Sequence, residues 1–195
     1  MTTSRRWVHA GLVALAAAAL VLGTPRLVRA QQHVHEAGTG NAARIRIPES
    51  MKVEHRAIHA ELEHATRAPG RVGASARALA GVLHPHFIRE EQIALPPLGL
   101  LVSLSRGESA SGMRDVLPMT DSLDAELPRM LDEHRAIGVA TRKLLADARA
   151  AGNARVVRLA EQLALHAQTE EEVFYPAAVL VGGLVRARAG AKPSP

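Results

Sequence analysis

Apolar residues recur every three or four positions along most of the chain after residue 47, and no segment shows the alternation expected of a strand. Alanine, leucine, arginine and glutamate, which favour helices, dominate these segments. The pattern predicts helices over residues 48–67, 72–95, 128–152 and 154–175, the last continuing towards residue 184. Short connections within the first and second pairs favour antiparallel neighbours. We therefore expect an all-α fold, an antiparallel four-helix bundle over residues 48–184.

Proline and glycine set the predicted boundaries of these helices. Pro48 and Pro128 suit first helical positions, where a missing N–H costs nothing. Pro85 lies inside the second helix and should kink it, because it removes one backbone donor and crowds the preceding turn. Residues 103–118 are interpreted as a crossover between the helix pairs. Residues 185–195 are predicted to be a disordered tail.

A duplicated motif relates the two predicted helix pairs. The sequence Glu-His-Arg-Ala-Ile occurs at residues 54–58 and again at 133–137. A second pattern, H-x-x-x-E-E-x-x-x-x-P, begins at His86 and again at His166. Each element keeps its place within its pair, so the bundle is predicted to be a helix-pair repeat with an approximate two-fold axis.

The repeat places histidines and carboxylates on the apolar faces of the helices. His86 and Glu90, like His166 and Glu170, are four residues apart and so share one helix face. His55 and His134 lie among apolar face neighbours. Buried imidazoles and carboxylates are costly without partners, and a pair of metal ions would satisfy them together. Nitrogen and carboxylate ligands suit iron, manganese or zinc.

The first thirty residues have the pattern of an export signal. Arg5 and Arg6 precede an apolar run over residues 11–23, and a small-residue cleavage site ends at Ala30. The run is short for a membrane span, which needs about 20 residues. The paired arginines also resemble a twin-arginine signal, against the alternative of an ordinary secretory leader. Residues 31–47 then form a polar lead-in that we expect to be flexible.

Composition and charge change meaning once the leader is set aside. The full chain has a formal net charge of +5, and the leader contributes four arginines and no acid. The remaining chain is nearly neutral, which argues against a nucleic-acid partner. The chain has no cysteine, so disulfides, thiolate metal sites and cysteine nucleophiles are excluded. Histidine and carboxylate remain as the strong metal ligands.

From about residue 48 to 180 the chain resembles the hemerythrin-like cation-binding family. The motifs that carry the resemblance are the two Glu-His-Arg segments and the two H-x-x-x-E-E segments. The resemblance implies a non-haem di-iron centre bridged by carboxylates, with manganese or zinc as alternatives. It implies the following ligands: His55, His86, Glu90, His134, His166 and Glu170.

One departure from oxygen-carrying hemerythrins affects the ligand set. They have a further histidine one turn after the third-helix histidine, and here that position is Gly138. The first helix instead offers His59, one turn after His55. We therefore hypothesise a division by helix pair. In this division His55, His59 and His86 hold one ion, His134 and His166 hold the other, and Glu90 and Glu170 bridge them.

The resemblance and the leader together predict a periplasmic or secreted di-iron protein that binds O₂ or NO for storage, scavenging or sensing. No stable membrane association is expected after cleavage. An alternative function is a redox enzyme or iron donor that reduces peroxide or NO, or repairs damaged iron sites, with an unidentified redox partner. A third reading is a structural bundle that binds only adventitious zinc.

Overall fold

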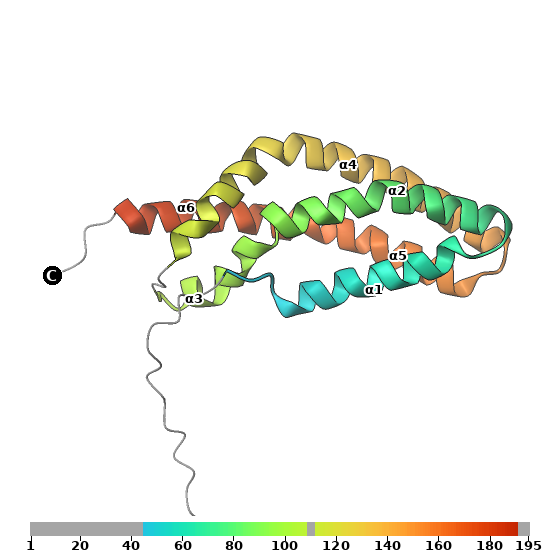
Figure 1. The fold of residues 1–195 in the computed structure, drawn as a ribbon, viewed down its shortest axis with the longest axis horizontal. Helices are drawn as coiled ribbons and strands as arrows, with labels where there is room; N and C mark the ends of the chain where they lie inside the picture. The colour runs from blue at the N-terminus through green and yellow to red at the C-terminus, as the bar shows by residue number, and fades with distance from the viewer. Residues whose placement is uncertain (1–44, 109–111, 191–195) are drawn as a thin grey trace, which may run out of the picture. The chain divides into compact units, whose positions relative to one another are not determined.

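A computed structural model of the chain describes residues 45–108 and 112–190. Four long helical segments form the bundle, and these ranges contain no strand (Figure 1). They are α1 (Glu49–Thr66), α2 (Gly70–Ile93), α4 (Leu117–Ala150), and α5 (Ala154–Thr169) continued by η3 (Glu170–Phe174) and α6 (Tyr175–Gly190). This confirms the predicted all-α four-helix fold. The predicted leader and most of the lead-in lie outside the described residues.

Each bundle helix packs against two others, and the order around the bundle is α1, α2, α4, α5. α1 therefore contacts both α2 and α5, while α4 contacts the same two helices from the other side. The connection between α2 and α4 is longer than the predicted crossover and contains two short 3₁₀ helices, η1 (Pro96–Leu100) and η2 (Met113–Val116), and the short α3 (Leu101–Ser105). Gly70 and Gly152 adopt positive φ at the two tight turns, a conformation that favours glycine.

The apolar core is divided into layers along the bundle. One cluster packs side chains of α1, α2, α4 and α5 near the two tight turns, including Ile58, Phe87 and Leu163. A second cluster lies towards the crossover and includes Met130 and Tyr175. Buried histidine and glutamate side chains come from the helical stretches that join these clusters. The polar residues are thus placed inside the bundle, away from bulk water.

The predicted start of the third bundle helix is wrong. Pro128 does not open a helix but lies inside α4, which begins at Leu117 with Pro118 in its first turn. The helix continues through Pro128 because it buries apolar residues on both sides, Leu123 before it and Met130 after it. Figure 1 shows the first part of α4 running at an angle to the rest, as expected of a helix with an internal proline.

The C-terminal helical segment also differs from prediction. α6 continues to Gly190, so at least residues 185–190 of the predicted disordered tail are helical. Val181 and Val185 pack on apolar residues of the crossover, which stabilises this extension. Gly182 allows the approach to α4, because a Cβ there would lie within 3 Å of the Thr120 side chain. No helix in the described residues is long and apolar enough to cross a membrane.

Candidate metal centre

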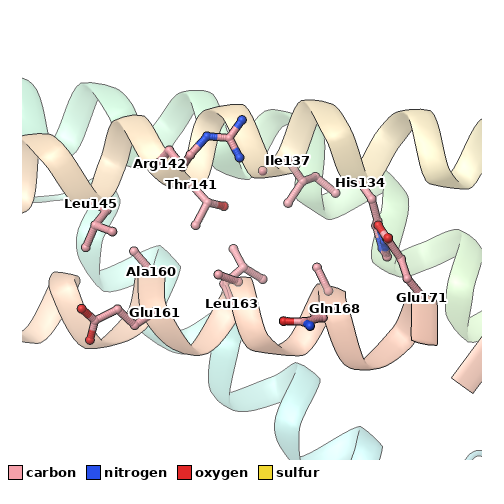
Figure 2. A pocket seen from close by; sticks show the side chains of 13 residues that line it. His134, Ile137, Thr141, Arg142, Leu145, Ala160, Glu161, Leu163, Gln168 and Glu171 are labelled. Atoms are coloured by element: carbon pink, nitrogen blue, oxygen red, sulfur yellow. The ribbon is translucent and has the colours of Figure 1, made fainter. Parts of the chain in front are cut away.

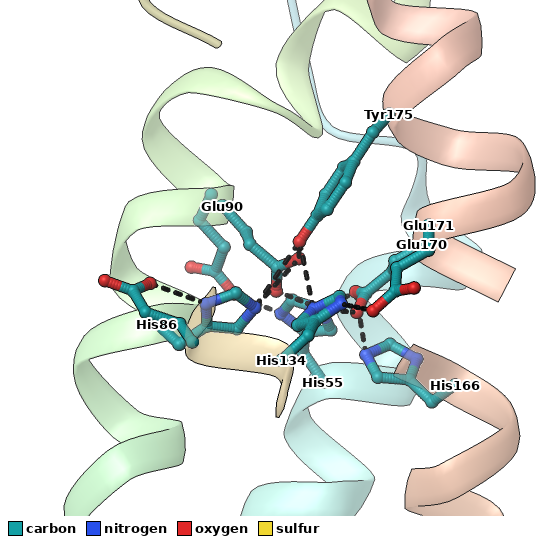
Figure 3. A network of polar contacts seen from close by, with 10 residues as sticks. His55, His86, Glu90, His134, His166, Glu170, Glu171 and Tyr175 are labelled. Carbon is teal, nitrogen blue, oxygen red and sulfur yellow. Dashed lines mark hydrogen bonds and ion pairs between the residues drawn. The ribbon is translucent and has the colours of Figure 1, made fainter. Parts of the chain in front are cut away.

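Six side chains from the bundle helices converge on one buried point (Figure 3). α1 supplies His55, α2 supplies His86 and Glu90, and α4 supplies His134. His166 lies near the end of α5, and Glu170 is the first residue of η3. None of the six is more than 4% exposed. The i, i+4 spacing on α2 and from α5 into η3 turns each histidine and its glutamate to the same face.

The six residues form two groups that share both carboxylates. His55 and His166 lie with Glu90 and Glu170 in one group, and His86 and His134 lie with the same two glutamates in the other. Within each group, one ligand atom from every residue lies within 4.8 Å of the others. Two pairs of imidazoles on either side of two shared carboxylates have the donor set of a carboxylate-bridged dinuclear centre.

Several of these buried atoms have no hydrogen-bond partner within the described residues. They are Nε2 of His55, both ring nitrogens of His166, Oε2 of Glu90 and Oε1 of Glu170. They lie close to one another without hydrogen-bond geometry, as at 3.6 Å between His55 Nε2 and Glu170 Oε1. Unpartnered buried polar atoms of this kind are costly, and bound cations would satisfy them. The residues present therefore fit a metal centre.

The predicted division of ligands by helix pair is wrong. His55 of α1 groups with His166 of α5, and His86 of α2 groups with His134 of α4. The reason is lateral packing: α1 lies beside α5 as well as beside α2. His59 belongs to neither group. It lies one turn along α1. There its ring packs edge to face against the ring of Phe87 and against that of His84, at 5.1 and 5.5 Å between centroids.

A carboxylate oxygen lies close to Nδ1 of each of the four clustered histidines. Glu91, Glu133 and Glu171 lie 3.1, 2.9 and 2.8 Å from Nδ1 of His55, His86 and His134. Glu54 lies 3.2 Å from Nδ1 of His166, without hydrogen-bond geometry. A histidine that donates its Nδ1–H to such an oxygen keeps the Nε2 lone pair free for a metal. The repeated Glu-His and Glu-Glu motifs therefore supply both the candidate ligands and the carboxylates that orient them.

Tyr175 contributes to the site although it is not one of the predicted ligands. Its hydroxyl donates to Oε1 of Glu90 and lies 3.1 Å from His134 Nε2 and 3.4 Å from His86 Nε2 (Figure 3). Its ring stacks beside that of His134 at 5.5 Å between centroids. In the sequence, Tyr175 is marked only by its position shortly after the H-x-x-x-E-E segment that begins at His166. An aromatic residue at that position is equally expected from ordinary core packing.

The buried charges perturb one another strongly. Burial raises the pKa of Glu90, and the charge of Glu170 raises it further. Burial opposes ionisation of Glu170 as well, but the nearby imidazoles of His134, His166 and His55 hold its pKa well below the usual value. For His86, burial disfavours the imidazolium, yet Glu90 and Glu133 outweigh it and raise the pKa to about 9. Burial and the nearby carboxylate charges also raise the pKa of Tyr175.

Comparison with protein families agrees with this geometry. The model of the hemerythrin HHE cation-binding domain matches residues 46–178. The chain belongs to this family. Comparisons with curated proteins and with solved structures returned no significant match. The matched range contains all six clustered residues, so the hemerythrin-like domain of this chain carries a histidine and glutamate cluster able to bind metal.

A pocket of about 410 Å³ lies between α4 and α5 of the hemerythrin-like domain, beside the cluster (Figure 2). His134 and Glu171 stand at one end, and Ile137, Leu163 and other apolar side chains form the walls. Gly138, where oxygen-carrying relatives have a histidine, also lines this pocket. Without a side chain at that position, the space beside His134 stays open.

Proposed function

We propose that the chain is an exported hemerythrin-like protein that holds two iron ions in the six-residue cluster and binds O₂ or NO there. The observation that carries the proposal is the sharing of Glu90 and Glu170 by two imidazole pairs. Each group offers only two histidines beside the shared carboxylates, which leaves coordination positions for a small ligand. Iron, when bound, supplies those open positions and the electrons for a diatomic ligand.

The pocket beside His134 supports access of such a ligand to the second group. It is mostly apolar, and it reaches a cluster residue at the point where Gly138 contributes no side chain. O₂ and NO are small and weakly polar, so they partition readily into apolar space. The apolar layers on either side of the cluster limit water around it and so slow proton-dependent loss of oxidised products.

Export is the part of the proposal that rests on the N-terminal sequence alone. Arg5 and Arg6, the apolar run over residues 11–23 and the small residues ending at Ala30 support it. N-terminal sequencing of protein from the periplasm or medium should begin at Gln31. Accumulation of the uncleaved chain in the cytoplasm would contradict export without bearing on the metal centre.

Tyr175 favours a second candidate function, reduction of peroxide or NO. A phenol that donates to a shared carboxylate can hold or pass a proton at its hydroxyl oxygen, beside the nitrogens of two cluster histidines. Reduction consumes protons and electrons, whereas reversible binding does not. Tyr175→Phe would then slow turnover while leaving simple ligand binding intact.

Purification without oxygen, followed by metal analysis and optical spectroscopy, tests the proposal. We expect two iron ions per chain and a spectrum that changes reversibly with O₂ or NO. Turnover with peroxide or NO would favour the second candidate function. Protein with no stoichiometric metal would overturn both and favour a structural bundle. His134→Ala and His166→Ala should each lower iron content strongly, and His64→Ala, an exposed change on α1, should not.

A further inference from the structure

Two histidines outside the buried cluster face each other at the surface between α1 and α2. The rings of His59 and His84 lie 5.5 Å apart between centroids and meet edge to face. His59 is partly buried and His84 is exposed. Imidazole is the commonest metal-binding side chain. Nitrogen ligation needs a nitrogen–metal distance of about 2.0–2.1 Å, which both rings can reach around one shared ion if the side chains rotate. The pair is therefore a candidate metal site of its own.

A carboxylate completes the donor set. Glu63 follows His59 by one helical turn and lines the same pocket of about 330 Å³ as His59 and His84. Its Oε1 lies 2.7 Å from Nη1 of Arg67, and both side chains are well exposed. Exposed ion pairs of this kind contribute little, so the carboxylate is free to turn towards the pocket. Two imidazoles and one carboxylate thus border one solvent-accessible space.

Phe87 lies between this pair and the buried cluster. Its ring meets that of His59 edge-on at 5.1 Å between centroids. The same ring stacks on His55 at 4.0 Å and meets His166 at 5.5 Å. One aromatic side chain therefore contacts His59 of the surface pair and both histidines of the first group.

We propose that His59 and His84, with Glu63, bind one divalent transition-metal ion and capture it before it enters the buried cluster. Two nitrogens and one oxygen select zinc, iron or cobalt over magnesium and calcium, which prefer oxygen ligands alone. The surface site rests on the three donor side chains that border one pocket and on rotation of those side chains towards a shared ion. Its role in capture rests on the proposed function, because it requires that the buried cluster holds metal.

A Zn²⁺ titration of the metal-loaded protein tests the surface site. Calorimetry should detect one further ion on the wild type, with no binding of Mg²⁺. His59→Ala and His84→Ala should each lose that ion, whereas His64→Ala should keep it. His64 is the matched control because it is an exposed histidine of the same helix. Equal Zn²⁺ binding by all three variants, with iron content unchanged, would overturn the site.

The rate of metal loading tests capture. Metal-free protein is mixed with limiting Co²⁺, the reaction is stopped with EDTA at set times, and the chelator-resistant ions are counted. His59→Ala and His84→Ala should load several-fold more slowly than the wild type and His64→Ala, and should reach the same final content. Equal loading rates would overturn capture. A wild type without chelator-resistant ions would overturn the buried metal cluster and capture together, while the Zn²⁺ titration would still decide the surface site.

Discussion

The hydroxyl of Tyr175, at the start of α6, donates a hydrogen bond to the carboxylate of Glu90 on α2. This contact depends on the π-helical turn η3, in which the backbone N–H of Tyr175 bonds to the carbonyl of Glu170, five residues earlier. In a regular α-helix the two residues would lie about 140° apart around the axis. The π turn brings Tyr175 over Glu170, so both side chains reach the cluster.

Tyr175→Phe removes the donor and keeps the aromatic ring. It leaves a buried carboxylate oxygen of Glu90 without that hydrogen bond, and we expect the free energy of unfolding of the metal-free protein to fall by about 1.5–3 kcal/mol. Urea unfolding of wild type and variant measures the difference. Identical midpoints and slopes would show that the contact contributes nothing to stability.

Glu171→Gln tests the carboxylates behind the histidines. Glu171 lies 2.8 Å from Nδ1 of His134, so it fixes the tautomer and the orientation of the ring. We expect the metal affinity to fall by roughly 10–100-fold, measured by competition with a chelator. Glu172→Gln is the matched control. The Glu172 carboxylate is exposed, and its one hydrogen bond among the described residues is accepted from Gln168. Equal affinities in both variants would contradict this role.

Raising the pH should destabilise the metal-free protein. The pKa of His86 is about 9 in the folded state, because Glu90 and Glu133 outweigh the effect of burial, and about 6.5 in the unfolded state. The folded state therefore holds the proton more tightly. That stabilisation is fully present below pH 6.5 and is lost as the pH rises through 9.

The loss is expected to be on the order of 3 kcal/mol between pH 6.5 and 9. Urea unfolding of the metal-free protein at both pH values measures it, and His86→Gln should flatten the dependence. Metal binding requires the neutral imidazole, so the affinity for metal should rise over the same range. Stability of the metal-free wild type that is flat or rises with pH would contradict the prediction.

Local periodicity was sufficient to predict the helices and the residues that converge. The spacing of His86 from Glu90 and of His166 from Glu170 fixes a shared face within one helical turn, whatever the rest of the fold does. The apolar neighbours of His55 and His134 likewise identify their buried faces. Tertiary structure only had to bring the four faces together.

Lateral packing and helix continuity could not be predicted in the same way. The pairing of His55 with His166 depends on contact between α1 and α5, which are far apart in sequence. Pro128 signals a helix start locally, but burial of apolar residues on both sides keeps α4 continuous. The π turn lies directly before Pro176, whose missing N–H is the signal that could have indicated an irregular turn there.

Gly138→Leu should close the pocket beside His134. A Cβ at Gly138 would meet only the flexible end of Arg142, at 3.3 Å, so the helix can accept the change and gains about 1 kcal/mol in helix propensity. We expect O₂ or NO to bind the iron-loaded variant several-fold more slowly, with unchanged iron content, in stopped-flow absorbance. Gly81→Leu controls for propensity, since a Cβ there meets nothing within 4 Å. Equal rates in the two variants would show that ligands reach the cluster by another path.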